Sequence, residues 1–162
     1  MSAKPEIAFY DVWQNKSPSL IREIVTTWKN AKVLPQGVDA EARAKEVVLV
    51  VRSSNKTIGI TTAKRMYYDP LRNEMYFMRG LVLPEYRVPG LFVKMITATL
   101  ERLERNFHEE DLEKKPIGVI AELENPRLKQ ANVTQLVSGM TLLGFSAKQN
   151  PIYVHYFKGS RY

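Results

Sequence analysis

One segment of the chain has residue types and spacing that could bind an anion. A strand predicted over residues 75–83 leads into Pro84-Glu85-Tyr86-Arg87-Val88-Pro89-Gly90, and an amphipathic helix is expected to follow at once. The first backbone N–H groups of a helix have no partner within the helix, and the helix dipole places partial positive charge at the same end. A strand, a glycine-containing turn and a helix start therefore predict a site for a phosphate-like anion.

The same region holds most of the positive charge. The protein has a formal net charge of +7, and residues 52–94 contain eight basic residues against three acidic ones. This excess favours an anionic partner, either a phosphate-bearing ligand or a nucleic-acid backbone. It is equally compatible with a solubilising surface, so charge alone leaves these alternatives open.

The turn has a narrower spelling than the general rule requires. Residues 82–90, read as Val-Leu-Pro-Glu-Tyr-Arg-x-x-Gly, resemble the acyl-CoA pyrophosphate loop of the GNAT superfamily of N-acetyltransferases, which is usually written V-x-P-x-(F/Y)-(R/Q)-x-x-G-x-(G/A). Five of the six signature positions are present, and the last is Phe92 instead of a small residue. The resemblance implies an α/β (α+β) fold: a mixed, mostly antiparallel sheet with two splayed parallel central strands and helices on both faces.

The resemblance also implies acetyl-CoA as a co-substrate. In that family, backbone groups of the strand before the loop pair with pantetheine, and N–H groups of the loop and first helical turn hold the pyrophosphate. The corresponding positions here, with a basic loop side chain and one asparagine on the last predicted helix, are Leu81, Val82, Leu83, Arg87, Val88, Gly90, Leu91, Phe92 and Asn132. Asn132 is one residue out of register with the family's asparagine.

The family's chemistry is direct attack of an amine on the thioester, which needs a general base and a general acid. The usual acid is a tyrosine four residues before the Gly-Phe that ends the last helix, but here that position is Met140, whose thioether cannot donate a proton. Tyr153 or Tyr156 on the final strand could substitute, although each also fits an ordinary strand aromatic. The residues that we single out as catalytic candidates are Glu74, Tyr76, His155 and Tyr156.

Phe92 and Pro89 depart from the loop pattern in ways that bear on binding. Phe92 keeps its backbone N–H, and its ring either lies on the sheet-facing stripe or fills the cofactor cleft. The stripe is predicted from apolar residues at spacings of three and four: Phe92, Ile96, Leu100, Leu103 and Phe107. Pro89 removes one N–H donor and is expected at the first helical position.

The remaining elements follow from periodicity and turn residues. The expected strands cover residues 6–13, 46–52, 57–68, 75–83, 117–123, 145–148 and 152–158. The expected helices are one with a serine cap near Pro18 (Ser17 or Ser19), a short one over residues 40–45, the long one after the loop, and one over residues 132–143 closed by Gly144. This order is also that of the GNAT fold, so the resemblance covers most of the chain.

Composition narrows the class of protein. With 162 residues, 44% hydrophobic and 25% charged, the chain is expected to be one globular domain over residues 1–162. The absence of cysteine excludes disulfides, thiol catalysis and a Cys-based zinc site, and the residue spacing predicts no metal site. The N-terminus has no signal-peptide pattern and no run is long enough to cross a membrane, so we expect a cytoplasmic protein.

These observations favour an acyl-CoA-dependent N-acyltransferase that acts on an unknown amine, either a small molecule or a protein. The alternative is a catalytically inactive GNAT-like fold acting as an interaction or structural protein, for example in a virus particle, and Met140, Phe92 and Pro89 favour it together. Nucleic-acid binding is the weakest interpretation and rests on basic residues with tyrosines among them over residues 64–68. The last strands could pair with a second copy to form a homodimer.

Overall fold

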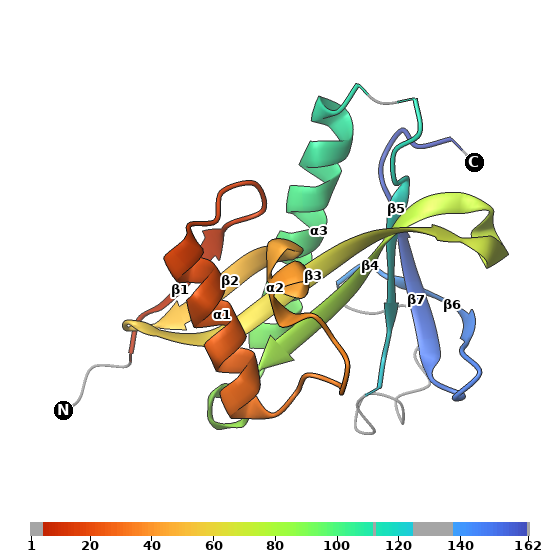
Figure 1. Cartoon of the computed structure of the whole chain (residues 1–162). Helices are drawn as coiled ribbons and strands as arrows, with labels where there is room; N and C mark the ends of the chain where they lie inside the picture. Colours follow the sequence, from red (N-terminus) through yellow and green to blue (C-terminus); the bar gives the residue numbers. More distant parts are fainter. Residues whose placement is uncertain (1–4, 112, 125–137, 162) are drawn as a thin grey trace. The chain divides into compact units, whose positions relative to one another are not determined.

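The computed structural model describes residues 5–111, 113–124 and 138–161. Within these residues, seven strands form one sheet in the order β1-β2-β3-β4-β5-β7-β6 (Figure 1). The strands are β1 (Ile7–Asp11), β2 (Val47–Ser53), β3 (Lys56–Tyr68), β4 (Asn73–Val82), β5 (Gly118–Glu122), β6 (Thr141–Phe145) and β7 (Pro151–Tyr156). Only β4 and β5 are paired in parallel among the strand pairs whose register is defined. The expected mixed, mostly antiparallel sheet is confirmed.

Three α-helices accompany these strands in the described part of the chain: α1 (Pro18–Ala31), α2 (Ala40–Lys45) and α3 (Leu91–Glu109). Short 3-10 turns cover Asp69–Leu71 before β4 and Pro84–Tyr86 after it. The ends of β1 to β5 lie within two residues of the predicted ends, and α2 has the predicted bounds. No helix in residues 5–111, 113–124 and 138–161 is long and apolar enough to cross a membrane.

The chain divides into two compact units. The first contains the described residues up to Ala63 together with Gly80–Met95, and the second contains Lys64–Arg79 together with the described residues from Ile96 onward. The expectation of one domain over residues 1–162 stays a prediction.

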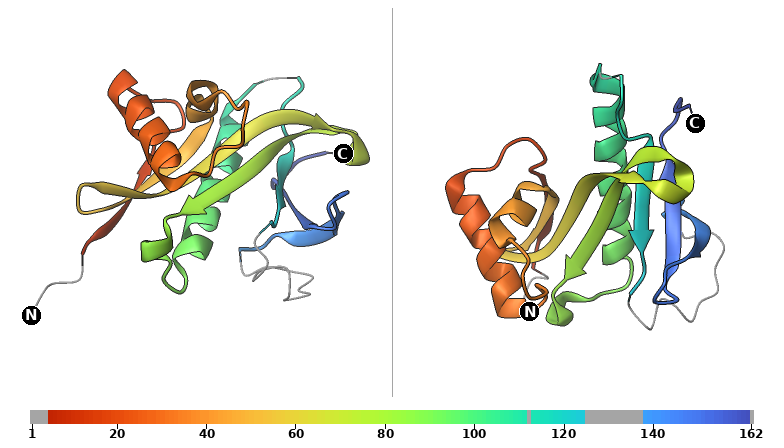
Figure 2. Two further views of the ribbon diagram at one scale, coloured as in Figure 1. Left: turned by 60° about the horizontal axis from the view of Figure 1, so that its bottom comes forward. Right: turned by 45° about the vertical axis from the view of Figure 1, so that its right-hand side comes forward.

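The first unit has helices on both faces of its strands. On one face, α1 and α2 lie over β2 and β3 (Figure 2). The core on this face consists of Val12, Ile24, Trp28, Ala44, Val47, Val50 and Ile60. On the other face, the start of α3 places Met95 over Gly59, which is paired with Val51. The two faces alternate along each strand, because Val50 pairs with Ile60 and the next residue pairs with Gly59.

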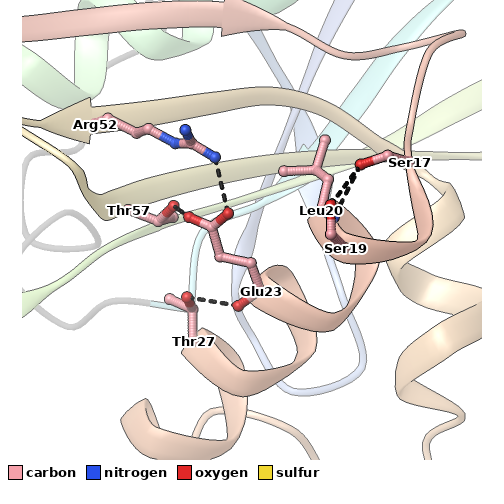
Figure 3. A network of polar contacts seen from close by, with 7 residues as sticks. All are labelled: Ser17, Ser19, Leu20, Glu23, Thr27, Arg52 and Thr57. Carbon is pink, nitrogen blue, oxygen red and sulfur yellow. Dashed lines mark hydrogen bonds and ion pairs between the residues drawn. The ribbon is translucent and has the colours of Figure 1, made fainter.

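Helix α1 begins as the sequence predicts and is tied to the β2–β3 hairpin. The backbone N–H of Leu20 donates to the Ser17 hydroxyl at 3.1 Å, so Ser17, and not Ser19, is the expected serine N-cap. One turn further on, the Glu23 carboxylate accepts from the Arg52 guanidinium at 2.8 Å and from the Thr57 hydroxyl at 2.7 Å (Figure 3). A single carboxylate therefore joins the helix to two adjacent strands.

Glu23→Ala is expected to lower the free energy of unfolding by about 1–2 kcal/mol. Two charge-assisted hydrogen bonds are lost, and their worth is reduced because Glu23 and Arg52 are about one third exposed. Urea unfolding followed by circular dichroism measures the change. Arg22→Ala, on the exposed side of the same helix, is the control and should change stability by less than about 0.5 kcal/mol. Equal losses in the two variants would contradict the prediction.

The second unit places one row of side chains under α3. Tyr76 of β4 pairs with Val119 of β5, which pairs in turn with His155 of β7. Paired residues point to the same side of a sheet, so these three share one face. On that face Phe107 of α3 packs on Phe157, with ring centroids 5.4 Å apart.

The opposite face of the second unit has an apolar cluster of its own. Its buried members are Met75, Ile117, Ile120 and Val154. Partly buried residues pack around them: Tyr68, Leu71, Phe77, Ile152 and Tyr156. The two faces of the second unit therefore differ, because α3 covers the first and side chains of the strands and their turns line the second.

The predicted last helix over residues 132–143 is wrong where the structure describes it. Residues 141–145 form β6, which pairs with β7, and Met140 before it is buried and not helical. Gly144 lies in this strand instead of closing a helix. Of these two neighbouring glycines, Gly139 has the positive φ, at 90°. The apolar spacing around Met140 fits a helix or a strand, and pairing with β7 decides for the strand. Residues 132–137, including Asn132, lie outside the described residues.

Candidate functional site

The predicted anion loop follows β4 and ends at α3. The N–H of Leu83 donates to Ile58 on β3 at 2.8 Å, and the N–H of Tyr86 donates back to Leu83 at 2.9 Å. Gly90 has a φ of 83°, a left-handed conformation that L side chains rarely adopt. The glycine of the motif is therefore required by the backbone that reverses the chain into α3.

Helix α3 begins at Leu91, so the prediction that Pro89 is its first residue is wrong. Pro89 and Gly90 form a turn, and the N–H of Lys94 bonds to Gly90 at 3.1 Å in the first turn of the helix. A residue with positive φ cannot continue a right-handed helix, so Gly90 sets the start one residue after itself. Pro89 and Gly90 are adjacent, so the sequence alone did not show which of them precedes the first helical residue.

The expected pyrophosphate donors fall into two groups. The N–H of Val88 bonds to Tyr86 at 2.9 Å and that of Leu91 bonds to Val88 at 3.3 Å, so both are used within the loop. Across the described residues, the N–H groups of Gly90 and Phe92 have no backbone partner of this kind. These two amides, at the positive end of α3, are the better donors for an anion.

Arg87 connects the loop to the end of β4. Its Nε donates to the carbonyl of Val82 at 3.1 Å, while the residue as a whole is exposed. Arg87 thus fixes the loop with one nitrogen and leaves its terminal nitrogens as charged donors.

Phe92 is half-buried, so its ring is not fully packed on the sheet-facing stripe, which was one of its two expected positions. The other four residues of the predicted stripe, Ile96, Leu100, Leu103 and Phe107, are buried. The buried face of α3 starts with Leu91 and Met95 instead of Phe92, because Met95 fills the space left by the missing side chain of Gly59. The apolar spacing correctly predicted the buried residues of α3 from Ile96 to Phe107, but not those of its first turn.

Tyr76 is a buried residue of the second unit. Its exposed fraction is 4%, and its hydroxyl accepts a hydrogen bond from the Asn106 amide at 3.2 Å. Burial is the main reason that the pKa of Tyr76 is raised, so the phenol stays protonated around neutral pH. Glu74, two residues earlier on β4, is paired with Arg65 at 3.4 Å.

His155 shares the face of Tyr76, and Tyr156 does not. The ring of Phe157 lies between them, 6.3 Å from Tyr76 and 6.2 Å from His155 by ring centroids. Tyr156 packs instead on the opposite face, against the cluster around Ile120. The structure thus groups two of the four catalytic candidates beneath α3 and places Tyr156 apart from them.

Glu122 is a polar residue that the sequence reading missed. It ends β5, where its carboxylate accepts from the Ser146 hydroxyl at 2.6 Å and from the Asn150 amide at 2.9 Å. These bonds, the Ser146 bond first, hold its pKa below the usual range against the opposing effect of burial. The available signal was an acid directly after the apolar run 117–121. Its hydrogen-bond partners come from a turn 24 and 28 residues away, which the sequence does not connect to it.

The described ranges contain no group of three or more acidic or histidine side chains that could hold a metal ion.

Comparison with known proteins informs the fold. No protein-family model matches the sequence, and no curated protein matches it either. Among solved structures, the chain is similar to a putative acetyltransferase from Salmonella typhimurium with its cofactor acetyl-CoA, at 12% identity and a TM-score of 0.60 over 96% of both chains. It is similar to a ribosomal-protein alanine acetyltransferase from Vibrio fischeri, at 10% identity and a TM-score of 0.63 over 100% of this chain and 98% of the other.

A third similar structure is a GNAT family acetyltransferase from Brucella melitensis in complex with acetyl-CoA, at 12% identity and a TM-score of 0.56 over 97% of this chain and 92% of the other. Identities this low establish the fold alone. The chain therefore has the GNAT fold, as the loop motif and the order of elements predicted.

Proposed function

We propose that this protein is an acyl-CoA-dependent N-acyltransferase that transfers an acetyl group from acetyl-CoA to an amine. The observation that carries the proposal is the loop between β4 and α3, where the motif from Val82 to Gly90 occurs in a GNAT fold. Gly90 has the left-handed backbone that brings the chain into the helix, with the N–H groups of Gly90 and Phe92 at its positive end.

The proposed binding roles follow the order of the loop. Backbone groups of residues 81–83 pair with the pantetheine arm, and the amides of Gly90 and Phe92 hold the pyrophosphate. Arg87 adds positive charge from its terminal nitrogens. Val88 and Leu91 contribute only if their bonds within the loop are exchanged for bonds to phosphate, and Asn132 remains proposed from the resemblance alone.

The proposed chemistry needs proton transfer and no covalent enzyme intermediate. Acetyl-CoA supplies the acyl group as a thioester. The amine nitrogen bonds to the carbonyl carbon, the carbon–sulfur bond breaks, and the thiolate takes up a proton as the amine loses one. Glu74 or His155 is proposed to accept the proton of the amine, and Tyr76 or Tyr156 to return one to sulfur.

Calorimetric titration of the folded protein with acetyl-CoA tests the proposal. Micromolar binding with one site per chain is expected. ATP is the control ligand, because it carries phosphate groups without the pantetheine arm and should bind far more weakly. Absence of heat at millimolar acetyl-CoA, with a normal circular-dichroism spectrum, would overturn the proposal.

One observation favours the second candidate, a GNAT-like fold that serves as an interaction or structural protein. The loop satisfies several of its own polar groups: the amides of Val88 and Leu91 and the carbonyl of Val82 all have internal partners. A loop that is closed in this way has fewer groups to offer a cofactor. Absence of acetyl-CoA binding in the same titration would favour this second candidate, and an assay of acetyl transfer to amines separates the two candidates if acetyl-CoA binds.

The proposal includes a cytoplasmic location and a homodimer as further expectations. β6 is an edge strand of the sheet and exposes Leu143 and Phe145, with exposed fractions of 37% and 62%. An edge strand has unpaired backbone groups that can pair with a second chain. Light scattering coupled to gel filtration would measure the oligomeric state.

A further inference from the structure

A cavity of about 670 Å³ lies within the second unit, where β4 begins. Its lining comes from segments that are far apart in the chain: the end of β3, the turn before β4, the connection from α3 to β5, and the C-terminal segment. All the lining residues belong to the second unit. The volume is within the range of sites that bind small molecules.

Two of the charged groups that line the cavity are already used within the protein. Glu74 is paired with Arg65, which also donates to the backbone carbonyl of Lys114. The Lys115 ammonium donates to the backbone carbonyl of Phe107 and lies over the ring of the same residue, 4.1 Å from its centroid. These contacts hold the wall of the cavity together, so we assign neither group to a ligand.

Three further cations line the cavity: Arg72, Lys114 and Arg161. Their side chains are exposed and form no hydrogen bond or ion pair with residues 5–111, 113–124 and 138–161. Glu113, which also lines the cavity, has no partner in these residues either. Three cations against one carboxylate leave these groups with a net charge of +2, which favours a doubly charged anion such as a phosphate monoester.

The backbone holds two of these cations in place. Arg72 has a left-handed φ of 51°, and its N–H donates to the Asp69 carbonyl at 3.1 Å. The carbonyl of Lys114 accepts from the Arg65 guanidinium. The two side chains therefore start from fixed positions at the cavity, and binding of an anion costs mainly their side-chain freedom.

Tyr67 gives the same cavity an exposed aromatic ring. Its exposed fraction is 54%, and it has no ring or cation contact among the described residues. An aromatic ring beside basic groups is a surface on which a nucleobase can stack. Tyr67 belongs to the basic and aromatic segment 64–68, which the acyltransferase proposal does not use.

The combination of groups distinguishes between classes of anion. A simple anion such as sulfate would use only the cations, would be repelled by Glu113 and would gain nothing from Tyr67. A nucleoside monophosphate has a doubly charged phosphate for the cations, ribose hydroxyls that can donate to the Glu113 carboxylate, and a planar base for Tyr67. Each unpartnered group of the cavity then has a complement on the ligand.

We propose that this cavity binds a nucleoside monophosphate unit. Arg72, Lys114 and Arg161 hold the phosphate, and Tyr67 stacks on the base. A free nucleotide and a single-stranded nucleic acid share this chemistry. The inference goes beyond the proposed acyltransferase function and does not depend on it, because none of these four residues has a role in that reaction.

Titration of ¹⁵N-labelled protein with AMP, without acetyl-CoA and followed by backbone amide shifts, tests the inference. Saturable shifts are expected at Tyr67, Arg72 and Lys114, with a dissociation constant of about 1 mM. Ribose 5-phosphate, which has the phosphate without the base, should bind about tenfold more weakly.

Two variants separate the contribution of charge from that of stacking. Arg161→Gln should raise the dissociation constant for AMP about fivefold, because one of three exposed cations is lost. Lys158→Gln is its matched control: it removes the same charge from the same segment, but Lys158 does not line the cavity, so the affinity should not change. Tyr67→Ala should weaken AMP binding about tenfold and leave ribose 5-phosphate binding unchanged.

Equal affinities of wild type, Arg161→Gln and Lys158→Gln for AMP would overturn the inference. So would AMP shifts that saturate only at Gly90 and Phe92, since the phosphate would then occupy the loop before α3, and this result needs no variant. A uridine oligonucleotide compared with UMP at one salt concentration distinguishes the two sources of the ligand. Tighter binding of the oligonucleotide that Tyr67→Ala weakens identifies single-stranded nucleic acid, and binding no tighter than that of UMP identifies the free nucleotide.

Discussion

Gly118→Ala is expected to lower the free energy of unfolding by about 3 kcal/mol, one of the two largest effects that we predict. A Cβ at position 118 would overlap the backbone oxygen of His155 and lie 3.1 Å from the Cα of Tyr156. Both atoms belong to β7, which pairs with β5 at this point, so the strands would have to separate. The Cε atom of Met75 would also lie 3.0 Å from this Cβ, but it is the end of a flexible side chain, so the two backbone contacts carry the prediction.

Gly144→Ala is the matched control for this prediction. Gly144 also lies in a strand that pairs with β7, but a Cβ there would meet nothing within 4 Å, and its φ is not left-handed. Its replacement should be neutral or raise stability by about 0.4–1 kcal/mol, because alanine restricts the unfolded chain. Guanidinium unfolding of the two variants and the wild type gives the comparison. Similar stabilities of the two variants would show that β5 and β7 are not packed as closely as the structure indicates.

Gly90→Glu is expected to weaken acetyl-CoA binding by more than about a hundredfold, which corresponds to about 2.7 kcal/mol. The substitution places a carboxylate beside the amides proposed to hold the pyrophosphate, where it repels the anion. It also forces a side chain into a φ of 83°, which costs about 1–2 kcal/mol of stability. Calorimetric titration with acetyl-CoA measures the first effect, and urea unfolding measures the second.

Gly37→Glu separates the charge effect from the backbone effect. Gly37 has a φ of 82°, has nothing within 4 Å of a Cβ, and lies in the same compact unit as Gly90. The two variants should therefore lose similar stability, and only Gly90→Glu should lose affinity. A loss of affinity in both would mean that general destabilisation is responsible, and a loss in neither would remove the loop from the proposed binding site.

The sequence correctly predicted the helices and strands whose caps, turns and apolar spacing all lie within one short segment. The serine cap and the apolar spacing of α1 lie within one segment, and the structure confirms both, with Ser17 as the cap. The strands from β1 to β5 were bounded by their own turn residues in the same way. The loop motif predicted the GNAT fold, because its spelling reflects a backbone requirement at Gly90 that no other residue meets as easily.

The sequence was insufficient where distant segments compete. The segment that includes Met140 and Gly144 had helical spacing, but hydrogen bonding of residues 141–145 to β7 makes it a strand. The buried face at the first turn of α3 contains Met95 instead of Phe92, because Met95 packs on Gly59, which is far away in the chain. Neither outcome can be obtained from intrinsic propensities, since tertiary pairing outweighs them.

The sequence by itself determined the α/β class, the N-terminal elements and the position of the loop between β4 and α3, because each depends on residues that are close together in the chain. Only the tertiary structure decided which polar groups meet. It placed Tyr76 and His155 on one face around Phe157, moved Tyr156 to the other, and joined Glu122 to Ser146 and Asn150. The physical reason is that strand register sets which side chains share a face, and register depends on pairing between segments that the sequence leaves far apart.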